Sequence, residues 1–98
     1  MEKRNYCVYC HTTPDGRVYI GQTQQKPEVR WGNGKLYKAN HEFTLACANY
    51  GWENIKHEIL AENLTRKEAY KIEREYIRTF DATNPLRGYN ILRGEQHK

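Results

Sequence analysis

The stretch YCVYCHTTPDGRVYIG (residues 6–21) decides the fold, because it has the pattern of a β-hairpin. Two short runs rich in β-branched and aromatic residues flank residues 12–16, whose proline and glycine favour a turn. Side chains alternate between the two faces of a strand. If the small apolar residues of both runs share one face, Tyr9 and Tyr19 lie together on the other, beside Arg17. Two phenols and a cation on one face predict a chemical site rather than a purely structural surface.

The bulk properties predict one small basic domain. The chain has 98 residues, expected to form a single domain over residues 1–98 with residues 93–98 as a flexible tail. Its net charge of +4 favours an anionic partner, nucleic acid first, although an ordinary basic domain is the competing interpretation. No apolar run approaches the roughly 18 residues of a membrane span, and no secretory signal opens the chain. We therefore expect a cytoplasmic protein with reduced thiols and no membrane partner.

Cys7 and Cys10 form a Cys-x-x-Cys pattern, which suggests zinc or redox chemistry as a rival hypothesis. Residues three apart on a strand point to opposite faces, so the hairpin separates the two thiols. The chain has only 3 cysteines, and a second pair is therefore missing for a zinc site. The pattern is better interpreted as part of a strand.

Two helices are predicted after the hairpin. The first is short, starts near Pro27 and ends at residues 32–34 (Gly-Asn-Gly), followed by an irregular basic and aromatic loop over residues 35–39. The second has Asn40 as its N-cap and ends at Gly51. Apolar residues recur between these two at helical spacing, which indicates a face that packs on the core.

A third strand and a third helix complete the expected fold. Residues 53–60 have the alternation of a strand. Residues 65–68 (Thr-Arg-Lys-Glu) form a capping box that opens a helix to about Phe80, and residues 88–92 return as a short final element. The fold class is therefore α/β (α+β): a small, largely antiparallel three-stranded sheet flanked by helices.

The predicted third helix carries a carboxylate on its apolar face. At about 100° per residue, Glu73 falls inside the apolar stripe, whereas Glu75 points roughly the opposite way. A buried charge is costly unless it is paired or binds a metal. Glu73 is therefore part of a functional site, or it pairs with a nearby arginine, or it lies at the margin of the stripe. The stripe consists of Ala69, Ile72, Tyr76, Ile77 and Phe80.

In this order, these features resemble the GIY-YIG nuclease family over nearly the whole chain. Residues 7–9 (Cys-Val-Tyr) occupy the place of the first motif, and residues 19–21 (Tyr-Ile-Gly) match the second in full. Arg30 stands where the family carries its arginine. Residues 73–77 are similar to the Glu-x-x-aromatic-Ile segment, which selects Glu73 over Glu75, and residues 88–90 resemble the terminal Gly-Tyr-Asn.

The chain departs from the family pattern in two places. The first motif keeps only its tyrosine, and the interval to Tyr19 is about one residue short, which the compact turn can absorb. Many members also have a histidine one turn after the arginine, where this chain has Gly34. Tyr37 and His41 are the two candidates to take over that role.

The resemblance implies a metal-dependent DNA endonuclease with one divalent ion, Mg²⁺ or Mn²⁺ as its substitute, held by Glu73, and no organic cofactor. Arg30 would brace the scissile phosphate as a planar donor. Tyr9 would be the general base for water, directly or through a relay, and Tyr19 would orient the water or hydrogen-bond the phosphate. Asn90 would hold local structure or a ligand in place.

The phenol of Tyr9 needs help to act as a base. A free phenol has a pKa near 10, so about a thousandth of it is ionised at neutral pH. Arg30 or Arg17, together with the metal, would have to lower this pKa by about one to three units. The mechanism predicts activity that rises into the alkaline range, and a flat profile from about pH 6 to 9 would count against Tyr9 as the base.

Contacts with DNA are expected from basic and aromatic side chains around the site. Without a recognisable second DNA-binding motif, we expect low sequence specificity or dependence on DNA structure, with a separate specificity domain or protein as a further partner. The sequence leaves the oligomeric state open. The alternative is a DNA-binding module of the same fold with weak or lost catalysis. The candidate contact residues are Arg17, Lys26, Lys35, Tyr37, Lys38 and His41.

Overall fold

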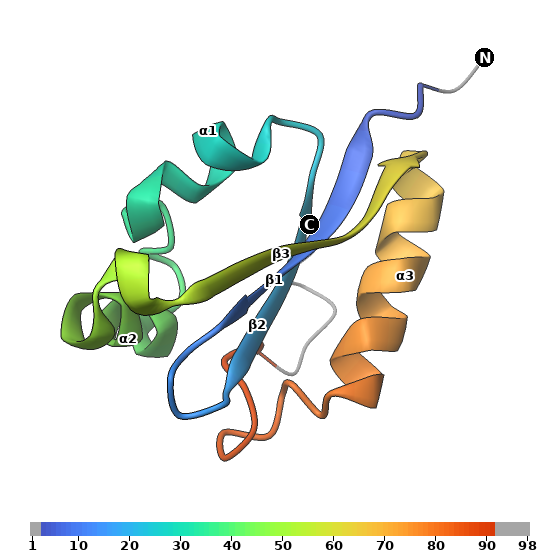
Figure 1. The fold of residues 1–98 in the computed structure, drawn as a ribbon. Coiled ribbons are helices and arrows are strands. Elements are labelled where there is room, and N and C mark those ends of the chain that lie inside the picture. The colour runs from blue at the N-terminus through green and yellow to red at the C-terminus, as the bar shows by residue number, and fades with distance from the viewer. Residues whose placement is uncertain (1–2, 92–98) are drawn as a thin grey trace.

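The computed structural model describes residues 3–91, which form an antiparallel sheet with helices on both faces (Figure 1). The sheet has three strands in the order β2-β1-β3, so β1 is central. No helix within these residues is long and apolar enough to cross a membrane. The predicted tail lies outside the described residues. The elements are β1 (Tyr6–Thr12), β2 (Val18–Thr23), α1 (Pro27–Trp31), η1 (Gly32–Gly34), α2 (His41–Tyr50), η2 (Trp52–Asn54), β3 (Lys56–Leu64) and α3 (Arg66–Thr79).

The predicted hairpin forms, and the apolar faces of its two strands coincide. Cys10 pairs with Ile20, and His11 pairs with Tyr19 across the β1–β2 ladder. Directly paired residues of antiparallel strands point to the same face. Tyr9, His11 and Tyr19 therefore share one face, as the alternation indicates, and the small apolar residues share the other.

The two faces of the sheet pack against different layers. On one face, Val8, Cys10 and Ile20 form a buried cluster with Ala69 of α3. Figure 1 shows α3 along this side of the sheet, with α1 and α2 on the other side. The opposite layer is an aromatic core, which we call the aromatic cluster: Tyr37, Phe43, Ala46 and Tyr89, with Tyr19, Trp31, Cys47, Tyr50 and Trp52 packed against them. The fold class predicted from the sequence is confirmed.

Helix boundaries follow the predicted capping residues. The side chain of Asn40 accepts a hydrogen bond from Phe43 N at 3.0 Å at the start of α2. At the start of α3, Thr65 Oγ1 accepts from Glu68 N at 3.1 Å, and Glu68 Oε1 accepts from Thr65 N at 2.9 Å. Each cap satisfies amide groups that the first helical turn leaves without an internal partner.

The third strand differs from the prediction of residues 53–60. It runs from Lys56 to Leu64, and residues 52–54 form the turn η2 instead. The strand is longer because its pairing with β1 continues through Tyr6 and Leu64, past a register irregularity between Tyr6 and Tyr9. Tertiary pairing with the central strand thus overrides the local pattern at both ends.

Candidate active site

The ring of Tyr9 lies across Gly21 of the edge strand β2. A Cβ atom on Gly21 would fall 2.5 Å from both Cζ and Oη of Tyr9, which is closer than any real contact. The backbone conformation of Gly21 is not in the left-handed region, so space alone requires glycine here. The glycine of the Tyr-Ile-Gly motif therefore makes room for the phenol of the first motif.

Asn90 forms hydrogen bonds with the outer edge of β2. Its Oδ1 accepts a hydrogen bond from Ile20 N, and its Nδ2 donates to Ile20 O, both at 2.8 Å. The amide thus pairs with the strand edge as a neighbouring strand would. Residues 88–92 were predicted to form a short final element. In the described part of this segment, up to Ile91, Gly88 forms an isolated parallel bridge with Val18. Asn90 is a positioning residue for β2, and hence for Tyr19.

Arg30 reaches the aromatic cluster from α1. Its guanidinium lies 4.8 Å from the ring centroid of Tyr37, and one of its terminal nitrogens donates to Leu36 O at 3.3 Å. Tyr37 is 2 % exposed, and its hydroxyl oxygen lies 3.5 Å from that of Tyr9. In this structure the Tyr37 ring is therefore enclosed by the protein.

Glu73 is buried on α3, as its place in the apolar stripe predicts, and Glu75 is exposed. The Glu73 side chain is 4 % exposed, and burial raises the pKa of its carboxyl to about 8. Its negative charge also raises the pKa values of Tyr9 and Tyr19. The carboxylate therefore lies within electrostatic range of both phenols.

The two phenols are harder to ionise than free tyrosine. Burial is the largest influence on the pKa of Tyr9 and raises it, while the charge of Arg30 and the hydrogen bond with Tyr37 lower it by less. For Tyr19, burial and the neighbouring Tyr9 raise the pKa, again against Arg30. Tyr9 as a base requires cations that lower its pKa; Arg30 acts in that direction, but burial dominates and raises the pKa.

Arg17 contacts Asp15 and the ring of Tyr89. Its Nε donates to Asp15 at 2.7 Å, and its guanidinium lies 4.5 Å from the ring centroid of Tyr89. It lines a groove of about 400 Å³ together with His41 and Asn90. This groove joins three of the predicted site residues. The predicted DNA contacts Lys26, Lys35, Lys38 and His41 are all exposed.

Gly34 has no room for the histidine that many family members carry. Its φ is +85°, and a Cβ there would meet Trp52 Cε3 at 2.7 Å. Of the two candidates for that role, Tyr37 contacts Tyr9, whereas His41 lies at the exposed start of α2. The ring of Trp52 thus occupies the space where such a side chain would begin.

Two histidines next to the site were not identified as site residues from the sequence. His11 is fully buried, with Nε2 at 2.7 Å from Tyr37 Oη and Nδ1 at 2.8 Å from His57 Nδ1. Burial, then the neighbouring His57 and Arg30, lower the pKa of His11 to about 2. The alternation of side chains along β1 puts His11 on the same face as Tyr9, and this is the signal in the sequence that could have identified it.

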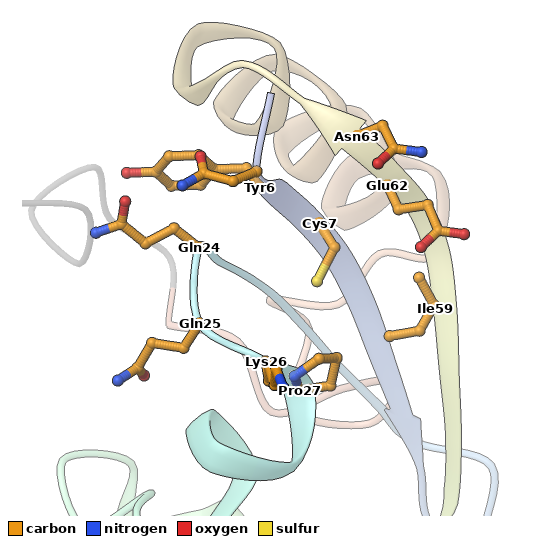
Figure 2. Close-up of a pocket in the computed structure, with 10 residues that line it drawn as sticks. Tyr6, Cys7, Gln24, Gln25, Lys26, Pro27, Ile59, Glu62 and Asn63 are labelled. Atoms are coloured by element: carbon orange, nitrogen blue, oxygen red, sulfur yellow. The ribbon is translucent and has the colours of Figure 1, made fainter. Parts of the chain in front are cut away.

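A second hollow is lined by residues of β1, β3 and the segment that leads into α1. Figure 2 shows a pocket of about 210 Å³ where the side chain of Cys7 points in from β1, with Lys26 and Pro27 below it and Ile59 at one side. Cys10 packs in the opposite layer, so the two thiols are separated as predicted. Within residues 3–91, no group of three or more histidine, cysteine or acidic side chains is arranged to hold a metal ion.

The comparison with protein families agrees with this geometry. The model of the GIY-YIG catalytic domain matches residues 5–90, a range that includes both tyrosines, Arg30, Glu73 and Asn90. Comparisons with curated proteins and with solved structures give no significant match. A GIY-YIG domain implies nuclease activity, with DNA as its substrate. The chain therefore belongs to the GIY-YIG family.

Proposed function

We propose that this protein is a metal-dependent DNA endonuclease that uses one divalent ion. The observation that carries the proposal is that Arg30 of α1 and Glu73 of α3 both lie close enough to Tyr9 of β1 and Tyr19 of β2 for their charges to act on the pKa values of these phenols. Phosphodiester hydrolysis needs an activated water, a cation at the phosphate and stabilisation of the leaving oxygen. These side chains offer groups for each requirement.

Each residue has a distinct task in this proposal. Arg30 binds the scissile phosphate through its planar guanidinium, which can donate two parallel hydrogen bonds. Tyr9 receives the proton of the attacking water. Tyr19 orients that water or donates to the phosphate, and Asn90 keeps β2 in place through Ile20.

A divalent ion fits the donor at Glu73. The carboxylate is buried, and a nearby cation would offset the desolvation that raises its pKa to about 8. One protein carboxylate with water and phosphate oxygens suits Mg²⁺, which keeps much of its hydration shell, and Mn²⁺ accepts the same ligands. When bound, such an ion would polarise the phosphate and stabilise the leaving oxygen.

The expected mode of DNA binding is electrostatic. Exposed Lys26, Lys35 and Lys38 are suited to phosphate contacts, and Arg17 and His41 line the groove beside Asn90. Phosphate contacts position a protein on DNA without reading its sequence. We therefore propose low sequence specificity, or recognition of a DNA structure such as a branch, flap or nick.

Nicking of supercoiled plasmid tests the proposal. The wild type is assayed with Mg²⁺, Mn²⁺ or EDTA, beside Glu73→Ala and the matched control Glu75→Ala, which alters an exposed carboxylate of the same helix. We expect nicking to require the metal, to be lost in Glu73→Ala and to persist in Glu75→Ala. A wild type that is folded and cuts neither plasmid nor branched or flapped DNA would overturn the proposal.

The second candidate is a DNA-binding module with lost catalysis. It is favoured by the burial of Tyr9, which is 1 % exposed, and of Glu73. A reacting water must reach both groups, so catalysis requires the site to open when DNA binds. Binding that is equally strong with and without Mg²⁺, combined with no cleavage, would support this candidate.

A further inference from the structure

Tyr37 contacts three of the side chains to which the proposed function gives a task. The central carbon of the Arg30 guanidinium lies over its ring, 4.8 Å from the centroid. Its hydroxyl donates to Tyr9 Oη at 3.5 Å. The ring of Tyr19 meets it edge to face, with centroids 5.2 Å apart. Tyr37 comes from the loop between η1 and α2, so it joins side chains of α1, β1 and β2.

Tyr37 is held in place at both ends of the residue. Its carbonyl oxygen accepts hydrogen bonds from Asn40 N at 2.8 Å and from Thr44 Oγ1 at 2.6 Å. Its ring packs edge to face on Phe43, with centroids 4.9 Å apart, and the residue is 2 % exposed. Its hydroxyl also lies 2.7 Å from His11 Nε2. A side chain that packing and hydrogen bonds fix in this way can hold its neighbours in position.

The ring of Tyr37 supports the guanidinium of Arg30. A cation over an aromatic face is attracted by the negative charge density of the ring. One terminal nitrogen of Arg30 also donates to Leu36 O at 3.3 Å. These two contacts leave most of the five N–H donors of the guanidinium for a phosphate. Without the ring, Arg30 would be a long side chain at the half-buried end of the short helix α1, and ordering it on a phosphate would cost conformational entropy.

The hydroxyl of Tyr37 orients the oxygen of Tyr9. A phenol oxygen accepts hydrogen bonds through its lone pairs, so the donor from Tyr37 occupies one side of Tyr9 Oη. The separation of 3.5 Å is long for two hydroxyl groups, and contacts of catalytic groups in free enzymes are often long and tighten when substrate binds. A donor at this oxygen also stabilises negative charge on it, because hydrogen bonds to a charged acceptor are the stronger ones.

We propose that Tyr37 is a positioning residue of the nuclease site, with its ring holding Arg30 for the scissile phosphate and its hydroxyl orienting Tyr9 toward the attacking water. This inference rests on the proposed nuclease function and deepens it, because it divides two tasks between two parts of one side chain. The ring acts on the binding of DNA through Arg30. The hydroxyl acts on the chemical step through Tyr9.

The first test observes the contact with Arg30 in the protein without DNA. Protons above an aromatic ring resonate upfield in NMR, so the Hδ protons of Arg30 should lie upfield of their position in an unstructured peptide. We expect this shift to persist in Tyr37→Phe, which keeps a ring, and to disappear in Tyr37→Leu, which does not. Unshifted Arg30 signals in the wild type, or an unchanged shift in Tyr37→Leu, would overturn the inference.

The second test separates the two parts of the side chain by the kinetics of plasmid nicking at saturating Mg²⁺. Tyr37→Phe should lose about tenfold in kcat and keep the KM for DNA, because it removes the contact with Tyr9 and keeps the ring under Arg30. Tyr37→Leu should lose the same factor in kcat and also raise KM about threefold to tenfold. A Tyr37→Phe enzyme with the wild-type kcat, or a Tyr37→Leu enzyme with the wild-type KM, would overturn the inference.

A double variant connects the effect on KM to Arg30. Arg30→Ala removes the guanidinium, so adding Tyr37→Leu to it should change KM no further. Effects of the two substitutions that multiply would overturn the role of the ring. Tyr50→Phe is the matched control, because it removes a hydroxyl from the same aromatic cluster, and it should leave kcat and KM unchanged. A loss in Tyr50→Phe equal to that in Tyr37→Phe would overturn the role of the hydroxyl.

These outcomes differ from those that test the nuclease function itself. Absence of cleavage by the wild type overturns the nuclease and the positioning role together, whatever the NMR signals show. Cleavage that needs Mg²⁺ and Glu73 but is unchanged in Tyr37→Phe retains the nuclease and overturns the inference. Circular dichroism establishes that each variant is folded before its kinetics are compared. If Tyr37→Leu does not fold, the wild-type Arg30 signals and the kcat of Tyr37→Phe decide.

Discussion

Gly21 shows how one missing side chain shapes the site. The ring of Tyr9 occupies the volume where a Cβ would stand, because a methyl carbon on Gly21 would lie only 2.5 Å from Cζ and Oη of that ring. Tyr9 comes from the central strand and Gly21 from the edge strand, so the glycine lets the phenol extend over β2. The glycine of the family's second motif thus leaves the space that the tyrosine of the first motif occupies. The second motif also supplies Tyr19.

We expect Gly21→Ala to displace the ring of Tyr9. The inserted methyl group should lower the free energy of unfolding by about 1–3 kcal/mol, as other overpacked substitutions do, and abolish nicking. Urea unfolding of Gly21→Ala, Tyr9→Ala and the double variant checks this. In the Tyr9→Ala background, Gly21→Ala should leave the free energy of unfolding nearly unchanged, because the colliding ring is gone. Equal losses in both backgrounds would contradict the steric explanation.

At the scale of elements, the edge strand β2 depends on a side chain for part of its pairing. Asn90 satisfies both the N–H and the C=O of Ile20, and Asn90 itself is 8 % exposed. A buried strand edge without such partners would leave polar groups of the backbone without hydrogen bonds. The amide therefore does for one residue of β2 what β1 does along its other edge.

Asn90→Ala should destabilise the protein by about 2–4 kcal/mol, since it removes two hydrogen bonds and leaves two backbone groups of Ile20 unsatisfied. Denaturant unfolding measures the loss. Asn84→Ala is a useful comparison, because the Asn84 side chain donates to Asp81 and accepts from Leu86 N in exposed hydrogen bonds. An Asn90→Ala loss no larger than that of Asn84→Ala would show that the pairing with Ile20 contributes little.

For the molecule as a whole, two buried titratable groups have opposite effects on how the free energy of unfolding depends on pH. The folded protein keeps His11 neutral, with a pKa lowered to about 2, so unfolding takes up a proton below the unfolded pKa of about 6.5 and stability falls as the pH falls. The pKa of Glu73 is raised to about 8, so the folded state binds a proton more tightly between about pH 8 and 4.5. Stability from this group rises as the pH falls.

In EDTA, the free energy of unfolding of the wild type should therefore change little with pH. That of Glu73→Gln should change more steeply. Without the opposing carboxyl, His11 alone should lower the free energy of unfolding by about 1 kcal/mol between pH 6.5 and 5.5. Thermal or urea unfolding at each pH measures both proteins. A Glu73→Gln protein that is as insensitive to acid as the wild type would contradict the assignment of His11 as a buried neutral base.

The sequence predicted the elements with strong local signals. Alternation placed Tyr9 and Tyr19 on one face, and helical periodicity separated Glu73 from Glu75, because both follow from backbone geometry. The capping residue Asn40 likewise marked its helix. These patterns are local, and they survive tertiary packing.

What the sequence could not predict depends on contacts between distant residues. His11 and His57 meet because β1 and β3 are paired neighbours, and 46 positions separate them in the chain. The length of β3 was set by the same pairing. Tyr37 stands in a basic loop and was a candidate DNA contact, and its burial follows only from the packed aromatic cluster. Such contacts have no signature within a short window of sequence.

The pairing of Ile20 with Asn90 has a consequence for protein synthesis. The two residues are 70 positions apart, and a ribosome delivers the chain from its N-terminus. The ribosome therefore releases Tyr9, Tyr19 and Arg30 well before Asn90, the residue that hydrogen-bonds the outer edge of β2. In a nascent chain that has not reached Asn90, Tyr19 lies on an edge strand that is incompletely paired. Completion of the proposed active site is therefore tied to translation of residue 90.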